Sequence, residues 1–440
     1  MPNASDHSTA PLPPLSTEKK QPRIPPVDSD FFQLFSTLTP EETSLRNRVR
    51  EFAESFRPVL ADAWEKAELP AGTIDRFKTT DFVAHMHRQE DDGTGRYDSV
   101  IDGLVTMELA RVDASLATLV GVQSGLAMGS IKLCGSEEQR NEWLPRMRRW
   151  EVTGSFGLTE PDVGSGVAGG LTTTCVRDGN EWRINGAKRW IGNATFADIT
   201  IVWARDVADN QVKGFIVDTK SPGFIATKMQ GKIAQRINQN ADISIENVQV
   251  PESRRLQRAN SFADTARVLS ATRAGVAWIA VGCAMGAYEH ALAYAQRRSQ
   301  FGKKLAEFQL IQRMLVTMLG QLTAMQTLAL RVSRMQQEGT VRDQHTSLAK
   351  QYCAARCREV VALARESLGG NGILLDHDVA RYFADAEAIY SYEGTNDINT
   401  LIVGRAITGY GAFVWGGTGG APPPRPPQER YTSRTPTILP

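Results

Sequence analysis

A block of short, alternating apolar stretches interrupts a chain whose remainder is patterned for helices. Apolar residues recur at helical spacing from about residue 39 to 150 and again from 261 to 413, whereas residues 153–260 alternate at every second position. Since the two periods belong to different secondary structures, the chain must divide into parts. The sequence predicts an α+β protein with an N-terminal helical domain at 31–152, an antiparallel β domain at 153–260 and a C-terminal four-helix bundle at 261–413.

Capping signals mark several of the predicted helices. Thr39 followed by Pro40 and two glutamates is typical of a helix start, and Gly135-Ser136 ends one helix and caps the next. We expect helices in the N-terminal part at 99–111 and 114–134, and in the C-terminal part at 263–299, 305–337 and 342–368.

The predicted β domain consists of short runs separated by turn residues. The runs cover 154–159, 171–177, 181–184, 199–204, 214–218 and 243–250. Asp178-Gly179-Asn180 and Asn185-Gly186 are typical hairpin turns. We expect both to connect antiparallel strands.

Proline-rich ends flank the three parts. Residues 1–30 and 414–440 carry few bulky apolar groups, and we expect both to be disordered. The N-terminal segment lacks the apolar core of a signal peptide and the chain does not end in a peroxisomal tripeptide, so we expect a cytoplasmic protein. The longest apolar run, 274–288, contains three glycines and is too short for a membrane span.

Composition argues against several classes of partner. Lys and Arg number 50 against 49 Asp and Glu, so a net charge of +1 favours neither nucleic acid nor an anionic membrane. The five cysteines contain no Cys-x-x-Cys pair, and Cys353 and Cys357 are expected to pack in a helical core. His85 and His87 are expected in a solvated loop, and no metal site is predicted.

The stretch 389–399 contains the strongest candidate for a catalytic group. Glu393 lies beside Tyr392 and Gly394 in the run Tyr-Glu-Gly-Thr, where neighbouring aromatic rings would desolvate its carboxylate and strengthen it as a base. The alternative interpretation is an ordinary exposed loop carboxylate, which applies to most isolated glutamates.

Four further motifs have the residue types of a nucleotide-cofactor site. They are the glycine-rich turn 157–166, the expected loop 188–193 with Trp190, the stretch 298–302 with Arg298, and the glycine cluster 368–372. Backbone N–H groups and arginine suit phosphates, and a tryptophan face suits a ring. Each has a structural alternative, namely a surface turn, a core tryptophan, a helix-end ion pair or a helix cap.

With these motifs in this order, the chain over roughly 31–413 resembles the acyl-CoA dehydrogenase and acyl-CoA oxidase superfamily. The motifs are Leu158-Thr159-Glu160-Pro161, Trp190-Ile191-Gly192-Asn193, Arg298 with Phe301-Gly302, Leu368–Gly372 and Tyr392-Glu393-Gly394-Thr395. Arg111-Val112-Asp113 and the run 404–409 are most similar to the branch of glutaryl-CoA dehydrogenases and plant short-chain acyl-CoA oxidases.

The resemblance implies FAD, an acyl-CoA substrate, a homotetramer and electron transfer to an electron-transfer flavoprotein or to O₂. It assigns cofactor binding to Leu158, Thr159, Ser165, Trp190, Gly192, Arg298, Gln300, Phe301, Glu366, Gly369, Gly370, Thr395 and Asp397, with the adenosine half held across a subunit interface. It assigns substrate binding to Ser165, Arg273, Tyr392 and Gly394.

By the same resemblance Glu393 is the catalytic base, which takes the α-proton of the thioester while the β-hydrogen leaves as hydride to the flavin. Some relatives carry the base at the position of Thr272, which cannot act as one here. Arg273 beside it is expected to help fix the charge of the site.

Three positions depart from the family pattern. Gly166 replaces a usual aspartate, and Gly192 replaces a threonine that meets the flavin in many dehydrogenases, which keeps an oxidase reaction with O₂ open. Ala117 stands where glutaryl-CoA dehydrogenases carry an arginine for the distal carboxylate, so we expect a non-glutaryl substrate. The resemblance to plant short-chain oxidases implies a short acyl chain. A glutaryl-CoA dehydrogenase-like enzyme and a flavin-bearing binding protein without turnover are the remaining alternatives.

Overall fold

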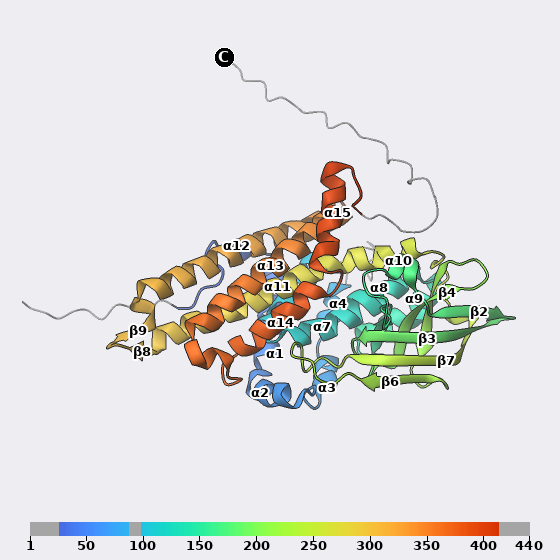
Figure 1. Ribbon diagram of the computed structural model, residues 1–440, viewed down its shortest axis with the longest axis horizontal. Coiled ribbons are helices and arrows are strands. Elements are labelled where there is room, and N and C mark those ends of the chain that lie inside the picture. Colours follow the sequence, from blue (N-terminus) through green and yellow to red (C-terminus); the bar gives the residue numbers. More distant parts are fainter. Residues whose placement is uncertain (1–25, 88–97, 413–440) are drawn as a thin grey trace, which may run out of the picture.

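The computed structural model describes residues 26–87 and 98–412, and it consists of a helical bundle, a group of N-terminal helices and a β-sheet (Figure 1). Most of the two predicted tails lies outside the described residues. Within 26–30, however, Ser29 is buried and its hydroxyl donates a hydrogen bond of 2.6 Å to Glu289. Packing therefore begins before Phe31.

The N-terminal part is helical, as predicted. Its elements are η1 (Leu34–Thr37), α1 (Pro40–Glu54), α2 (Arg57–Lys66), α3 (Thr73–Lys78), α4 (Phe82–Met86), α6 (Ser99–Val112), α7 (Ala114–Val120), the π-helical η2 (Gly121–Met128), α8 (Gly129–Cys134) and α9 (Glu137–Arg148). Thr39 and Ser136 each form a capping box, in which the N-cap hydroxyl accepts a hydrogen bond from the backbone N–H three residues later and that residue's side chain accepts one from the N-cap N–H. Both predicted helix starts are confirmed.

The predicted solvated loop around His87 is wrong at that residue. His87 follows α4, is only 2% exposed, and places its Nε2 3.1 Å from the hydroxyl of Ser124 in η2. His85 contacts Asp81 at 3.0 Å, one helical turn earlier. The isolated sequence could not show that α4 packs against η2. In 26–87 and 98–412, no cluster of three or more metal-binding side chains occurs.

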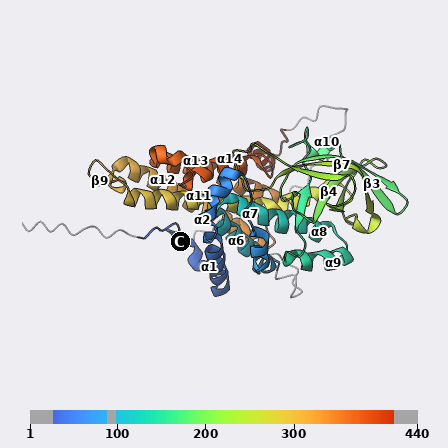
Figure 2. The ribbon, with the colours of Figure 1, turned by 90° about the horizontal axis from the view of Figure 1, so that it is seen from below.

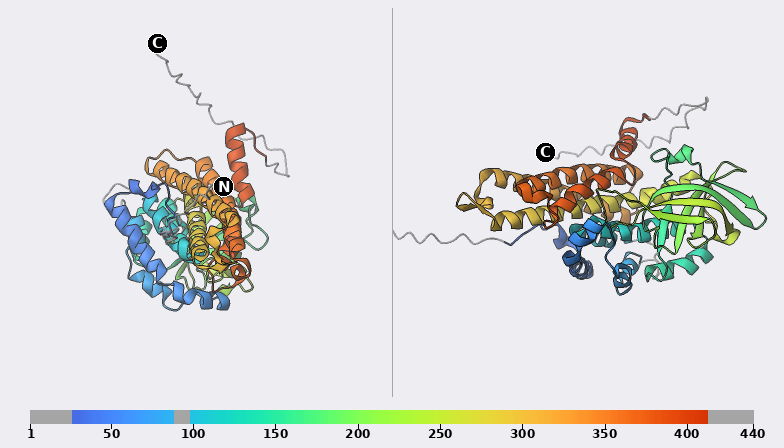
Figure 3. Two further views of the ribbon diagram at one scale, coloured as in Figure 1. Left: turned by 90° about the vertical axis from the view of Figure 1, so that its left-hand side faces the viewer. Right: turned by 60° about the horizontal axis from the view of Figure 1, so that its bottom comes forward.

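The β domain forms one sheet of seven strands, which Figure 3 shows curling beside the helices. The strands are β1 (Gly154–Gly157), β2 (Thr174–Asp178), β3 (Glu181–Ile191), β4 (Ile199–Asp206), β5 (Val212–Asp218), β6 (Phe224–Lys228) and β7 (Ala241–Pro251), with the short helix α10 (Val167–Gly170) after β1. Four pairings are antiparallel, as expected, but β1 and β2 run parallel to β4, and β6 was not anticipated.

One predicted hairpin turn is confirmed and the other is wrong. Gly179 adopts a left-handed conformation between β2 and β3, which pair antiparallel. Asn185-Gly186 lies instead within β3, where the register with β7 shifts between Ile184 and Gly186. A side chain at Gly186 would collide with Thr173, so glycine here permits a β-bulge and a close backbone approach.

The C-terminal part contains the long helices of the bundle. Its elements are η3 (Glu252–Arg254), α11 (Phe262–Arg297), β8 (Ser299–Gln300), β9 (Lys303–Lys304), η4 (Leu305–Glu307), α12 (Gln309–Gln337), α13 (Asp343–Ser367), η5 (Gly369–Ile373), α14 (Val379–Ser391) and α15 (Asn396–Thr408). Helices α11 to α14 run side by side, and α15 projects from them (Figure 1). Seen from below, α1, α2 and α6 cover one side of this bundle (Figure 2).

Glycines let α11 pack closely on α6. A Cβ atom at Gly282 or Gly286 would collide with the carbonyl oxygens of Met107 and Arg111 respectively. Buried Trp278 lies against Gly103 in the same contact. Gly282 and Gly286 of the longest apolar run are thus required by helix packing, because only hydrogen fits between the two backbones.

Two helical stretches, Ala114–Cys134 and Phe262–Arg297, are long and apolar enough to cross a membrane by length and composition alone. The expectation that no stretch reaches this length is therefore wrong. In each, 72% of the apolar window is buried inside the fold, as in the core helices of a globular protein. Cys353 and Cys357 are fully buried on α13, which confirms their predicted core packing.

Candidate active site

The loop between α14 and α15 presents Glu393 in an unusual backbone conformation. Glu393 and Gly394 both lie in the left-handed region, with φ of 58° and 80°. The hydroxyl of Thr395 accepts a hydrogen bond of 3.2 Å from Ile398 N and caps α15. A left-handed glutamate is strained and persists only where its surroundings hold it, which is typical of functional positions.

The Glu393 carboxylate faces α11, and it accepts a hydrogen bond from the hydroxyl of Thr272. Burial raises the pKa of Glu393, while the Thr272 donor and the positive charges of Arg273 and Lys350 oppose that rise. A carboxylate with a raised pKa is a stronger base than an exposed one. The position of Thr272 and the loop of Glu393 therefore belong to one site.

Arg273 is close enough to act on Glu393 electrostatically, but its hydrogen bonds go elsewhere. Its guanidinium contacts Asp343 and, at 3.3 Å, the hydroxyl of Ser347 on α13. Tyr392 receives a hydrogen bond of 3.4 Å on its hydroxyl from Gln235, and burial raises the pKa of that phenol. Gln235, in the β6–β7 connection, was not identified from the sequence.

A buried ion pair holds the turn that contains Leu158 and Thr159. Lys188 of β3 donates hydrogen bonds to Leu158 O at 3.1 Å and to Glu160 Oε1 at 2.9 Å. Burial alone would raise the pKa of Glu160, but Lys188 and the hydrogen bonds from Thr172 and Thr173 outweigh it and hold the pKa at about 2. Burial lowers the pKa of Lys188 to about 8. Glu160 belongs to a motif that is evident in the sequence, whereas its pairing with Lys188 is evident only in the structure.

Trp190 lies near the end of β3 and not in the predicted loop, whereas Gly192 lies in the turn that follows this strand. Trp190 has a left-handed φ of 66° and is 54% exposed, with Arg189 over its ring at 5.8 Å. Gly192 is buried, and an added Cβ would lie 3.1 Å from Val122 of η2. Register shifts between β3 and β7 at Lys188 and Ile191 turn this segment toward the helices.

The remaining predicted site residues are exposed. Ser165 and Gly166 lie in the turn before α10, and Asp397 lies in the first turn of α15. Arg298, Gln300, Phe301, Glu366, Gly369 and Gly370 lie on the surface at the far end of the bundle. At that end, Asn371 of η5 donates a hydrogen bond of 2.8 Å to the hydroxyl of Tyr294 in α11. This bond connects the segment of Gly369 and Gly370 to the helix that precedes Arg298.

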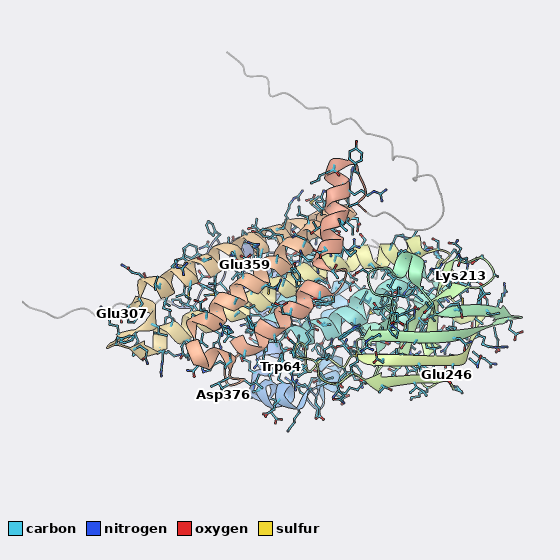
Figure 4. All side chains as sticks on the ribbon, in the orientation of Figure 1. Trp64, Lys213, Glu246, Glu307, Glu359 and Asp376 are labelled. Carbon is cyan, nitrogen blue, oxygen red and sulfur yellow. The ribbon has the colours of Figure 1, made fainter. Side chains whose placement is uncertain are left out.

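One chain does not bring these bundle-end residues to Glu393. Thr272 lies in α11, and Arg298 is the C-cap residue of the same helix. Because an α-helix rises about 1.5 Å per residue, the two residues lie roughly 40 Å apart. Figure 4 labels Glu307, which lies in η4 directly after β9, at the opposite end of the molecule from Lys213 and Glu246 of the β domain.

Comparison with known proteins agrees with the division of the chain into three parts. Models of the N-terminal, middle and C-terminal domains of acyl-CoA dehydrogenase match residues 39–151, 155–248 and 262–408. The chain belongs to the acyl-CoA dehydrogenase family.

Three members of this family match this chain over nearly the whole of their own length. An acyl-CoA dehydrogenase of Bacillus subtilis is 30% identical over 84% of this chain and 99% of its own. A subunit of the caffeyl-CoA reductase–Etf complex of Acetobacterium woodii is 31% identical over 82% and 96%. A glutaryl-CoA dehydrogenase structure from Mycobacterium smegmatis is 35% identical, covers 88% and 99%, and has a TM-score of 0.82.

As an acyl-CoA dehydrogenase, this protein is an oxidoreductase acting on CH–CH groups with FAD as cofactor, and a further structure of the Mycobacterium smegmatis enzyme contains FADH2. The residues present fit a flavin. Asn193 and Asn238 each have a buried side-chain oxygen without a hydrogen-bond partner in the described part of the chain. Both flank Gly192, next to the exposed face of Trp190, so acceptors and a stacking plane remain for a ring.

Proposed function

We propose that the protein dehydrogenates a short-chain, non-glutaryl acyl-CoA thioester to the 2-enoyl-CoA, with Glu393 as the base. The hydrogen bond from Thr272 to Glu393 is the observation that supports this most strongly, because it joins the two positions that carry the base in this family. Bound FAD supplies the hydride acceptor.

In this proposal the chain's own residues hold and move the α-proton. Glu393 removes the proton as a carboxylate, and its raised pKa makes the transfer more favourable. The backbone N–H of Glu393 is the proposed donor to the thioester carbonyl, which must be polarised because thioester α-protons are weak acids. Tyr392, Gly394, Arg273 and Ser165 are proposed to contact or orient the substrate.

The exclusion of a glutaryl substrate rests on Ala117. This residue is fully buried in α7, and the methyl group provides no positive charge for a distal carboxylate. The resemblance to a glutaryl-CoA dehydrogenase thus extends to the fold, while the group expected to recognise glutarate is replaced.

We further propose that each flavin site takes parts from two copies of the chain, within a homotetramer. Leu158, Thr159, Trp190, Gly192, Thr395 and Asp397 would contribute from one copy, and Arg298, Gln300, Phe301, Glu366, Gly369 and Gly370 from another. The roughly 40 Å between Thr272 and Arg298 within one chain supports this division.

Electrons are proposed to pass to an electron-transfer flavoprotein, as the name of the Acetobacterium relative indicates for that protein. An acyl-CoA oxidase is the second candidate, and Gly192 favours it, because no hydroxyl is available at this position. The five free, buried cysteines fit a reducing compartment, and we place the enzyme in the cytoplasm.

Anaerobic titration tests the proposal. Purified FAD-loaded protein should lose flavin absorbance on addition of short-chain acyl-CoA and keep it with glutaryl-CoA. Failure with a full panel of acyl-CoA chain lengths would contradict the enzymatic assignment. Rapid reoxidation by O₂ with formation of H₂O₂ would identify the oxidase, whereas reoxidation only by an electron-transfer flavoprotein would identify the dehydrogenase.

A further inference from the structure

A fully buried lysine lies directly behind the loop that carries Glu393. Lys350 projects from α13 and has 0% exposure. Its Nζ donates hydrogen bonds of 2.9 Å to Tyr390 O and 2.9 Å to Gly394 O. One ammonium group therefore joins the two ends of the segment 390–394, which has Glu393 near its centre.

The two acceptors are carbonyl groups that secondary structure leaves unpaired. Tyr390 O belongs to the last turn of α14, where helical carbonyls lack partners and a positive charge is favourable. Gly394 O follows the left-handed pair Glu393 and Gly394. Because a left-handed glutamate is strained, the turn needs contacts that fix it from outside, and Lys350 provides two of them.

A neutral side chain shares one of these acceptors. Asn399 of α15 donates from its amide to Gly394 O at 3.0 Å and to Thr395 O at 3.1 Å. Asn399 and Lys350 hold the same carbonyl, but only Lys350 also carries a charge. This difference separates the effect of tethering from the effect of charge.

The charged groups acting on Lys350 are Glu393 on the loop and Arg273 on α11. Arg273 is itself paired with Asp343 at the start of α13. Burial lowers the pKa of Lys350 to about 8, so the lysine is mainly protonated at neutral pH. Its ammonium then opposes the effect of burial on the pKa of Glu393.

We propose that Lys350 is a positioning residue for Glu393: it fixes the backbone turn that aims the carboxylate and supplies the positive charge that keeps this carboxylate ionised. The inference rests on the proposed role of Glu393 as the base. It adds a residue that touches neither substrate nor cofactor and acts through the loop.

The test compares Lys350→Met, Lys350→Arg and Asn399→Ala in the FAD-loaded enzyme, with Lys213→Met as a control. Lys213 is a largely buried lysine of β5 that pairs with Asp209 at 2.6 Å, far from the site. The measurements are the pH dependence of flavin reduction, the substrate affinity, and an infrared titration of Glu393 obtained as the difference from Glu393→Gln.

Lys350→Met should raise the pKa of Glu393 by about one unit and slow reduction at least about tenfold, with substrate affinity nearly unchanged. Lys350→Arg should keep the wild-type pKa, because the charge remains. Asn399→Ala should slow reduction without shifting the pKa, and Lys213→Met should change neither.

A folded Lys350→Met protein with an unshifted Glu393 pKa would overturn the inference. If Lys350→Met does not fold, a raised Glu393 pKa in Lys350→Arg would overturn it instead. The infrared titration requires no turnover, so it tests Lys350 even if no acyl-CoA reduces the flavin, and the two proposals can fail separately.

Discussion

The hydroxyl of Thr272 donates a hydrogen bond to the Glu393 carboxylate, although 121 residues separate the two in the chain. A long core helix and a loop between two later helices thus meet at one carboxylate. Thr272 cannot serve as a base, but it stabilises the ionised form of the group that can.

Removing this donor should change the pH profile of the enzyme. In Thr272→Val the carboxylate loses a hydrogen bond to its charged form, so the pKa of Glu393 should rise by about one unit. Activity requires the ionised base, and the acidic limb of the kcat profile should therefore move to higher pH. Thr272→Ser retains the hydroxyl and should match the wild type, and equal shifts in both variants would argue against the hydrogen bond as the cause.

Exchange of the base between the two positions is a second prediction. Glu393→Gln should retain FAD and abolish flavin reduction by acyl-CoA, because an amide cannot accept the α-proton. Adding Thr272→Glu to this variant should restore part of the reduction rate, because the side chain at position 272 lies within hydrogen-bond distance of the side chain at position 393. Stopped-flow absorbance measures the rate of flavin reduction in both variants. Undiminished reduction in Glu393→Gln would refute the role of Glu393 as base.

The buried pair of Glu160 and Lys188 should stabilise the β domain and the turn that contains Leu158 and Thr159. Glu160→Gln leaves Lys188 buried without its counter-charge, and we expect a loss of about 3–5 kcal/mol in the free energy of unfolding at pH 7. Denaturant titration measures it. Neutralising the exposed pair of Asp178 and Arg183 by Asp178→Asn should cost less than about 1 kcal/mol.

The same pair predicts part of the acid sensitivity. The pKa of Glu160 is held at about 2, below its usual 4.5, so its contribution to stability is complete above pH 4.5 and is lost as pH falls toward 2. Between these values the wild-type free energy of unfolding should fall more steeply than that of Glu160→Gln. Parallel curves would show that Glu160 is not the group responsible.

Subunit mixing tests the two-copy flavin site. Trp190→Ala and Arg298→Ala should each lower FAD retention, because one removes the stacking plane and the other a phosphate donor. Hetero-oligomers containing both variants should recover FAD in a fraction of their sites, since some sites then combine intact Trp190 with intact Arg298. Absence of recovery in confirmed mixed oligomers would place both residues in the site of one chain.

The sequence was most informative where function or local geometry depends on neighbouring residues. Thr39 and Ser136 marked helix starts correctly because a cap acts within one turn. Tyr392-Glu393-Gly394 predicted a desolvated carboxylate, and burial raises the pKa of Glu393 in the structure. Hydrophobic periodicity distinguished the helices of the bundle from the strands of the sheet, because the period depends only on residues a few positions apart.

Features that depend on distant partners were missed. A lysine in an amphipathic helix gives no sign that it will be buried under a loop 40 residues later, as Lys350 is. Similarly, Lys188 pairs with Glu160 only because the fold places β3 beside the turn that contains Glu160. Asn185-Gly186 was interpreted as a turn because the same residues suit hairpins and bulges, and pairing with β7 decides between them.

The π-helical stretch Gly121–Met128 sets the phase of the helix that follows it. A π turn takes in an extra residue, so α8 is rotated about its axis relative to the direction that α7 would have continued in an α-helix. Gly125 is thereby placed beside Thr272, with 3.2 Å between an added Cβ and the threonine methyl group. Deleting a single residue from this stretch would remove the extra residue, so the shortened stretch would wind as an α-helix and the later side chains of α8 would keep their directions.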